Sequence, residues 1–452
     1  MFVTRVLCHN PPACGRTPPP GRDRYTLSAG GSRIVSRTSH ALPPPPSSSY
    51  CSLAILHSSL FIVSPGPPAP LVIQSACHHL GGGETLDAHP VAILSATYRT
   101  AERQIREALR MLDYRPQRRN ILLKPNLVAV PRWLPLGSIP RSTITDLRFI
   151  EALLRIFDGY HVTIADGALA GTDTGAVLER SGVAALARRY GARVVNLDRA
   201  ERFDVPWAYG TLRLPALLRT HEYVNVPKLK THVQAGVTLG CKNQKGLLTG
   251  ADKIRFHRTL GLHDGIRALA QVVHPALTIV DGIVGMEGAG PTLGRSRRAH
   301  LLVAGRDVHA VDVACCDLIS VPLGQVRYLD RVPYRVLGRT VEDVRLRFAT
   351  STEIVIANAH IHVAQGTCSR CLQSMHDGLA AFWRSPHHIL RGTWSCILNR
   401  TDVITGQDHE IPSAARGRLV CYGDCTRSLA ERLDLRWIPG CPPRVDRFLD
   451  VF

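Results

Sequence analysis

Apolar runs alternate with amphipathic stretches through the middle of the chain. The runs that are typical of buried strands lie at 91–94, 120–126, 161–166, 192–197, 222–226, 276–281 and 300–304. The stretches with apolar residues at helical spacing lie at 100–112, 145–157, 175–190, 262–272 and 308–319. Strands of nearly continuous apolar residues, separated by helices, predict an α/β fold with a mostly parallel sheet and flanking helices.

The two ends of the chain differ in composition from this middle part. Residues 1–90 are rich in Pro, Ser, Gly and Arg, which predicts a disordered low-complexity tail, with the folded protein beginning near Val91. Residues 331–452 contain six of the 13 cysteines. We therefore expect three regions: the tail over 1–90, an α/β core domain over 91–330, and a small Cys-containing C-terminal domain over 331–452.

Charge and hydropathy narrow the class of protein. The net charge of +19 would suit a polyanion, but the arginines are dispersed and aromatic residues make up 6% of the chain, which argues against a nucleic-acid surface. The apolar run at 53–63 is too short to span a membrane and does not have the order of a secretory signal. The sequence predicts a cytoplasmic protein whose thiols stay reduced or bind a metal.

Lysine is rare and confined to one part of the chain. Of the 55 Lys and Arg residues, six are lysine, and all six lie between residues 124 and 253. A lysine amine is a compact charge whose pKa shifts readily, whereas an arginine stays charged. The clustering indicates an anion or cofactor site. The alternative is chance clustering in a chain whose arginine bias reflects a GC-rich genome.

Polar residues follow the apolar runs where a parallel sheet gathers its ligands. They include Lys124, Asn126, Asp166, Lys228 and Asp281. In open α/β sheets, ligands bind outside the carboxyl ends of the strands. Any one of these residues alone is typical of a turn or a cap, but together they predict one shared site.

Segment 223–246 predicts a short strand ending at Pro227 and then a basic, glycine-containing loop. The loop carries Lys228, Lys230, His232, Lys242, Asn243 and Lys245. Glycines let backbone N–H groups approach an anion, and the order of residues is neither a Walker A loop nor a dinucleotide fingerprint. We expect an anionic small molecule to bind here, with His232 and His257 handling protons or binding a metal. A structural role is the alternative for either histidine alone.

A second glycine-rich segment, 281–294, follows the next strand. Its two carboxylates, Asp281 and Glu287, are suited to hold a divalent cation or to pair with the lysines. The alternative is a structural loop that packs against the site.

Six sequence blocks support a family resemblance. They lie at 123–126, 163–167, 225–232, 242–246, 281–291 and 310–312. Over roughly residues 90–330 they resemble the bacterial and archaeal family known as domain of unknown function 362. Members of that family are often associated with iron–sulfur clusters, and their biochemical role is largely unassigned. The resemblance thus implies an iron–sulfur-associated protein without naming its reaction.

A weaker resemblance is to the nickel-pincer lactate racemases. In that family a His and a Lys ten residues apart are followed by a second His, and here His232, Lys242 and His257 have a similar spacing. The resemblance implies an acid/base role for His232, cofactor attachment at Lys242 and nickel ligation by His257. The glycine-rich sequence between these residues in the racemases is not reproduced here.

Four cysteines near the C-terminus form a candidate metal site. Cys368, Cys371, Cys425 and Cys441 supply four thiolates on predicted turns, as a [4Fe–4S] cluster or a zinc ion requires. The segment around Cys441 is similar to the last cluster-ligand segment of the cluster-bearing small subunit of respiratory complex I. Cys421 competes with Cys425 as a ligand, and the absence of any metal is a further alternative.

Two functional hypotheses follow from these patterns. In the first, the strand-end site binds an anionic small molecule and works with a C-terminal iron–sulfur centre, as in an oxidoreductase. In the second, the protein is a non-enzymatic metal-binding protein or electron carrier whose lysine segment docks an acidic partner.

Overall fold

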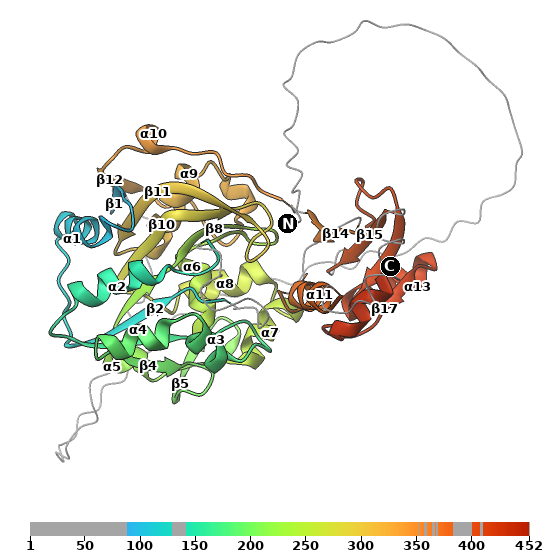
Figure 1. Ribbon diagram of the computed structural model, residues 1–452, viewed down its shortest axis with the longest axis horizontal. Coiled ribbons are helices and arrows are strands. Elements are labelled where there is room, and N and C mark those ends of the chain that lie inside the picture. Colours follow the sequence, from blue (N-terminus) through green and yellow to red (C-terminus); the bar gives the residue numbers. More distant parts are fainter. Residues whose placement is uncertain are drawn as a thin grey trace, which may run out of the picture. The chain divides into compact units, whose positions relative to one another are not determined.

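The computed structural model describes residues 88–128, 142–351, 353–356, 359–363, 367, 369–382, 400–406 and 410–451. Residues 1–87 of the predicted tail lie outside the described part of the chain, and so does Cys368. Along the described part, a ten-stranded sheet is followed by a five-stranded sheet (Figure 1).

The large sheet is mostly parallel, which confirms the predicted fold class. Its order is β12 (Tyr334–Gly338), β1 (His89–Ser95), β11 (Arg295–Gly305), β10 (Leu277–Glu287), β7 (Glu222–Val226), β2 (Asn120–Pro125), β3 (His161–Asp166) and β4 (Arg193–Asn196). The five strands from β10 to β4 run parallel, whereas β11 is antiparallel to both β10 and β1. Two further strands, β8 (Lys228–His232) and β9 (Gly236–Thr238), form a hairpin beside β10.

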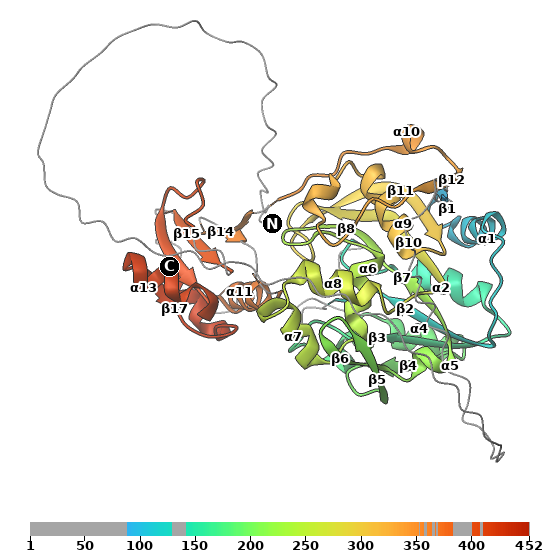
Figure 2. The ribbon, with the colours of Figure 1, turned by 180° about the vertical axis from the view of Figure 1, so that it is seen from behind.

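Helices pack on both faces of the large sheet (Figures 1 and 2). One face is covered by α1 (Ala101–Met111), α2 (Leu147–Ile156), α3 (Thr174–Arg180) and α4 (Val183–Arg189). The other face carries α6 (Gly240–Asn243), α7 (Gly250–Arg258), α8 (Leu262–Ala270) and α9 (Val308–Leu318). Successive side chains of a strand point to opposite faces of the sheet, so Val91 and Ile93 belong to one core and Ala92 and Leu94 to the other. None of the described helices has the length and apolar character that crossing a bilayer needs.

The smaller sheet is also layered between helices. Its order is β13 (Glu353–Ile356), β14 (Ala359–Val363), β15 (Thr401–Thr405), β16 (Arg418–Tyr422) and β17 (Arg436–Ile438), with β14 to β17 parallel. Helix α11 (Ser369–Phe382) packs on one face through Cys371, Leu372 and Met375. Helix α13 (Arg427–Leu433) packs on the other face, where Cys421 lies.

Some predicted elements were wrong in form. The single helix predicted over 175–190 is two helices, α3 and α4, because Gly182 adopts a left-handed conformation (φ 85°) and ends the first one. A β-carbon at Gly182 would also lie 2.9 Å from Cδ1 of Leu147, so the turn has no room for another side chain. The hairpin of β5 (Arg202–Trp207) and β6 (Gly210–Pro215) was not predicted.

The predicted basic loop after Pro227 is also corrected. It contains strands β8 and β9, helix α6 and the 3-10 turn η1 (Gln244–Leu247), and all five residues of β8 are buried. The segment predicted as a glycine-rich loop from Asp281 is in large part the continuation of β10 as far as Glu287, with a bulge between Gly282 and Val284. These strands were not predicted because they contain polar residues. Inside the protein, hydrogen bonds and ion pairs replace the water that such residues usually need.

A buried ion pair joins β8 to β10. Lys228 and Asp281 are both fully buried, and Nζ lies 2.7 Å from Oδ2. The same carboxylate accepts a hydrogen bond from the backbone N–H of Asp146, and the hydroxyl of Tyr98 lies 3.1 Å from the Lys228 amine. Burial raises the pKa of Asp281, while Lys228 opposes this rise. The pair and its hydrogen bonds fix β8 at the end of the sheet, so Asp281 acts as a structural residue in this fold.

We predict that Asp281→Asn destabilises the protein by roughly 3–5 kcal/mol, because it leaves the Lys228 ammonium buried without its partner. Adding Lys228→Met should recover much of that loss, since the remaining groups are neutral and of similar size. Urea unfolding of the two single variants and the double variant measures the coupling. Additive losses would contradict the importance of the pair.

Candidate functional site

A cavity of about 460 Å³ opens at the carboxyl ends of β2 and β3. Seven of the residues predicted to be catalytic or to bind a ligand line it: Lys124, Asn126, Asp166, Lys242, Asn243, Lys245 and His257. They come from strand ends, from α6 and η1, and from α7, which are separated by more than a hundred residues in the sequence. The structure thus brings together most of the residues that the strand-end rule selected.

An ion pair between Lys124 and Asp166 forms the floor of the cavity. The Nζ and Oδ1 atoms lie 2.6 Å apart, and both side chains are almost fully buried. The other carboxylate oxygen accepts the backbone N–H of Leu127, which ties the end of β2 to the end of β3. A β-carbon at Gly246 would lie 2.6 Å from the Lys124 amine. Only glycine lets the η1 backbone cross the pair this closely.

Amide side chains extend this floor toward α6. Asn243 accepts a hydrogen bond from Asn126 at 3.0 Å and donates one to Asn225 at 2.8 Å. Helix α6 is held from the opposite side by Asp312 of α9, whose carboxylate accepts the backbone N–H groups of Gly240 and Cys241 at 2.7 and 2.9 Å. Burial raises the pKa of Asp312 to about 7. These contacts fix the position of the short helix that carries Lys242 and Asn243.

Lys242 differs from the other lysines in its surroundings. Its amine contacts the hydroxyl of Thr238 at 3.5 Å, and no carboxylate of the described residues pairs with it. Burial lowers the pKa of Lys242 to about 8. An amine on a cavity wall with this pKa can serve either as a cation or as a base or nucleophile near neutral pH.

Lys245 and His257 form a pair on the same cavity wall. The lysine amine lies 3.0 Å from Nε2 of His257. Burial lowers the pKa of His257 well below its ordinary value, and the neighbouring charges of Lys245 and Lys242 lower it further. The lowered pKa favours the neutral form of His257, and its predicted role in handling protons or binding a metal stays a prediction.

Other predicted residues are not among those that line the cavity. Lys228 and Asp281 pair with each other, and Lys230 donates to the backbone carbonyl of Thr143 at 2.9 Å. Nδ1 of His232 accepts the backbone N–H groups of residues 234 and 235 and so shapes the β8–β9 turn. Glu287 binds Arg295 at 2.7 Å, and its other oxygen accepts the N–H of residue 349. The structure thus places Asp281 and Glu287 in two separate polar networks rather than around one shared cation position.

The cavity is also lined by three charged residues that were not predicted as site residues: Lys253, Arg370 and Asp424. Lys253 bonds to Asp198 at 3.0 Å and to the carbonyl of Ala168 at 2.8 Å. Its membership of the six-lysine cluster was a signal that could have identified it. Arg370 and Asp424 belong to the C-terminal part, where no pattern in the sequence connects them to the lysines.

Two of the predicted metal-binding cysteines, Cys425 and Cys441, also line the cavity. The turns that carry them are joined, since Asp424 donates its N–H to the carbonyl of Gly440 at 3.0 Å and its side chain accepts the N–H of the same glycine at 2.6 Å. Cys371 of α11 is buried nearby, and a β-carbon at Gly423 would lie 3.4 Å from its sulfur and 3.7 Å from that of Cys425. The segments that carry Cys371, Cys425 and Cys441 therefore lie close together, and the fourth predicted ligand, Cys368, lies outside the described residues.

Cys421 points away from these thiols. It packs with Leu429 and Ala430 of α13, whereas its neighbours Val420 and Tyr422 face the core that contains Cys371. Successive residues of a strand face opposite sides of a sheet. The geometry thus favours Cys425 over Cys421 as a partner of Cys371.

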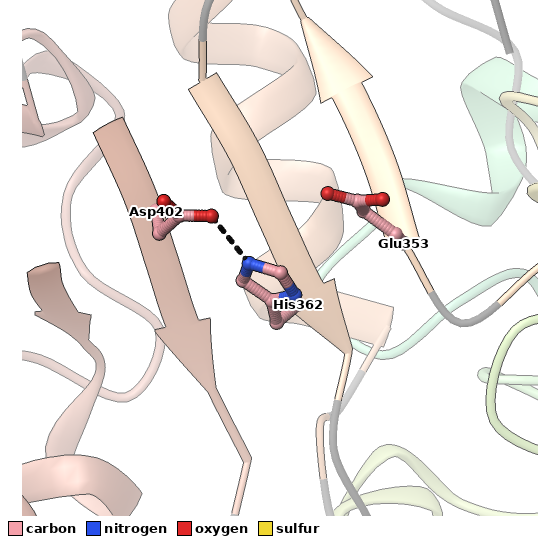
Figure 3. A group of neighbouring side chains, drawn as sticks. All are labelled: Glu353, His362 and Asp402. Atoms are coloured by element: carbon pink, nitrogen blue, oxygen red, sulfur yellow. Dashed lines mark hydrogen bonds and ion pairs between the residues drawn. The ribbon is translucent and has the colours of Figure 1, made fainter. Parts of the chain in front are cut away.

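A separate polar group lies in the small sheet (Figure 3). Glu353, His362 and Asp402 have potential metal-binding atoms within 4.8 Å of one another. Asp402 already accepts hydrogen bonds from His362, from Arg400 and from the N–H groups of residues 416 and 417. Although burial acts in the opposite direction, these donors hold the pKa of Asp402 well below its usual range. With Glu353 also bonded to His360 at 2.6 Å, the group acts as a structural network that joins β13, β14 and β15.

Comparison with known proteins agrees with the resemblance for the core. A family model described as "Domain of unknown function (DUF362)" matches residues 121–317, a range that contains all six lysines. The thylakoid-associated protein sll1697 of Synechocystis sp. is 27% identical over 247 residues, which cover 53% of this chain and 74% of that protein. Cys371, Cys425 and Cys441 lie outside the residues that the family model matches. Residues 121–317, which include most of the cavity wall, thus match a family that is defined by sequence and has no reaction in its description.

Proposed function

We propose that the cavity binds an anionic organic molecule of low molecular weight. Five cationic side chains line it (Lys124, Lys242, Lys245, Lys253 and Arg370), against two carboxylates, Asp166 and Asp424. Asp166 neutralises Lys124, and Asp198 pairs with Lys253. No carboxylate of the described residues pairs with Lys242, and Lys245 and Arg370 line the same cavity, so its cations favour a ligand with two or three negative charges. This excess of cations over carboxylates in one cavity is the observation that carries the proposal.

Other features of the wall support an organic ligand rather than a bare inorganic ion. Val128, Leu169 and Ile254 give the cavity an apolar side, and its volume is in the range of small-molecule sites. The Oδ1 atom of Asn126 is buried and accepts no hydrogen bond within the described part of the chain. A buried acceptor of this kind favours a ligand with a hydrogen-bond donor.

We further propose that Cys368, Cys371, Cys425 and Cys441 hold a [4Fe–4S] cluster at one wall of this cavity, with zinc as the alternative. The thiol donors around Gly423 suit iron–sulfur or zinc chemistry. Among the described residues, the three cysteines are not gathered within 4.8 Å of one another. Four sulfurs around one zinc ion are closer than this, whereas a cluster spreads its ligands over several irons. When bound, a cluster would supply one-electron chemistry beside the anion, so we propose an oxidoreductase.

The second hypothesis, a protein that docks an acidic partner through its lysine segment, has less support. The lysines lie inside a cavity or are buried, and Lys124, Lys228 and Lys230 are at most 1% exposed. A docking surface needs charges that a macromolecule can reach. We retain a cytoplasmic location as a proposal. Because one relative is named a thylakoid-associated protein, fractionation of native cells is the measurement that tests this location.

We predict that Lys242→Ala weakens the binding of a small polyanion by about tenfold or more, because it removes a charged group from the cavity wall. Isothermal titration calorimetry with citrate and with inorganic phosphate measures this loss. Arg335→Ala is the matched control, since this exposed arginine of β12 does not line the cavity. Equal affinity of the Lys242→Ala variant and the wild type would remove the basis for an anion site.

Anion binding should also depend on pH. The Lys242 amine is charged below its pKa of about 8 and neutral above it, so the affinity for citrate should fall as the pH rises from 7 to 9. The fall should reach about tenfold at pH 9. Lys242→Arg keeps its charge over this range and should remove that part of the pH dependence. If wild type and Lys242→Arg show the same profile, a different group titrates.

The cysteine proposal predicts a visible chromophore. Protein purified or reconstituted without oxygen should contain iron and acid-labile sulfide, and Cys371→Ser or Cys441→Ser should lose most of both. Cys421→Ala should keep them, because this thiol faces the opposite side of the sheet. Absorption spectra with iron, sulfide and zinc analysis decide the outcome. Zinc in place of iron would select the alternative metal, and a colourless, metal-free wild type would refute both.

A further inference from the structure

The environments of four buried or half-buried lysines separate their possible roles. Lys124 lines the cavity but is paired with Asp166, and Lys228, which is not among the lining residues, is paired with Asp281. Lys230 is sealed in the interior, where it bonds to backbone carbonyls. Lys242 alone among these four lines the cavity and has no carboxylate partner in the described part of the chain.

We propose that Lys242 is a nucleophile that condenses with the carbonyl group of an anionic oxo acid bound in the cavity. This inference rests on the proposed anion site, because the other cations must hold the acid beside Lys242. It goes further in naming the substrate class and the bond that forms.

The step is a condensation that needs no further reactant. The lone pair of Nζ forms a bond to the carbonyl carbon, and the oxygen leaves as water with the two hydrogens of the neutral amine. The product is an imine between Lys242 and the former carbonyl carbon. No electrons are exchanged, so the step is independent of whether the neighbouring cysteines hold a metal.

Burial of Lys242 supports this chemistry. Since its pKa is lowered to about 8, the neutral amine at pH 7 is about 300 times more abundant than for an ordinary lysine. Its contact with Thr238 is a weak one at 3.5 Å, so the amine can turn toward a ligand. No carboxylate of the described residues holds Lys242 as an ion pair, and the other cations that line the cavity are available to bind the acid's own carboxylates.

The cavity wall also selects the acid. Lys245 and Arg370 add cations to the lining that suit carboxylates, and the apolar residues Val128, Leu169 and Ile254 in the lining suit a short carbon chain. A 2-oxo acid with one or two carboxylates and a few carbons combines these groups with a carbonyl. Sugars without charge and long acyl chains lack this combination.

Reductive trapping tests the proposal. The wild-type protein is incubated at pH 7 with pyruvate or with 2-oxoglutarate and sodium cyanoborohydride, then digested and analysed by mass spectrometry. We expect a secondary-amine adduct at Lys242, in at least about a hundredfold excess over the adduct at any other lysine. Peptide mapping of the wild type gives the position directly, so the result does not depend on the folding of a variant.

Lys242→Arg is the matched variant, because it keeps the positive charge and removes the nucleophile. It should yield no adduct at position 242, and circular dichroism should show that the variant is folded. Citrate binding by the wild type without any adduct would overturn the imine and leave the anion site intact. Absence of both binding and adduct would overturn the proposed function, and an adduct spread evenly over lysines would also overturn the role of Lys242.

Discussion

The fold depends on how it buries lysine ammonium groups at the carboxyl edge of its sheet. Removing an ammonium group from water costs several kcal/mol unless a carboxylate or several carbonyls replace the water. Asp166 forms an ion pair with Lys124, Asp281 forms one with Lys228, and backbone carbonyls accept hydrogen bonds from Lys230. Each of these partners comes from a different strand or loop, so satisfying the charges forces those segments into one arrangement.

This constraint gives three of the lysines a structural role. Lys124, Lys228 and Lys230 hold β2, β3, β8 and β10 together and have little capacity left for a ligand. Lys242 lies on α6 and Lys245 on η1. Asp312 holds α6 in place by accepting two of its backbone N–H groups, and Gly246 lets η1 pass close over the floor of the cavity. A rigid support of this kind is what a binding site needs, since a cation that is already positioned loses little freedom when a ligand arrives.

The sequence predicted the architecture better than the site. Strands such as β3 and β7 were recognised because they are apolar throughout, and the strand-end rule then selected Lys124, Asn126 and Asp166 correctly as neighbours. It failed at β8, where the pattern Lys-Leu-Lys-Thr-His has the polarity of a surface loop but is entirely buried. No sequence pattern reveals that a lysine has a buried carboxylate partner fifty residues away, because the pair is made by the fold. For the same reason the sequence did not show that His232 accepts hydrogen bonds in a turn or that Glu287 binds Arg295.

The largest difference between the sequence prediction and the structure concerns the distance between the lysine segment and the cysteines. In the sequence the lysine segment and the cysteine region are more than a hundred residues apart and were interpreted as two centres, whereas Lys242, Cys425 and Cys441 line one cavity. Charges that share a partly buried space interact more strongly than charges separated by water. Cations at one wall stabilise any negative charge that develops on thiolates at the other, and an anion bound between them weakens that effect. Because such coupling is reciprocal, the charge state of the cysteines would alter the affinity of the proposed anion site as much as the anion would alter the cysteines. The lysine segment and two of the cysteines thus contribute to the lining of one cavity.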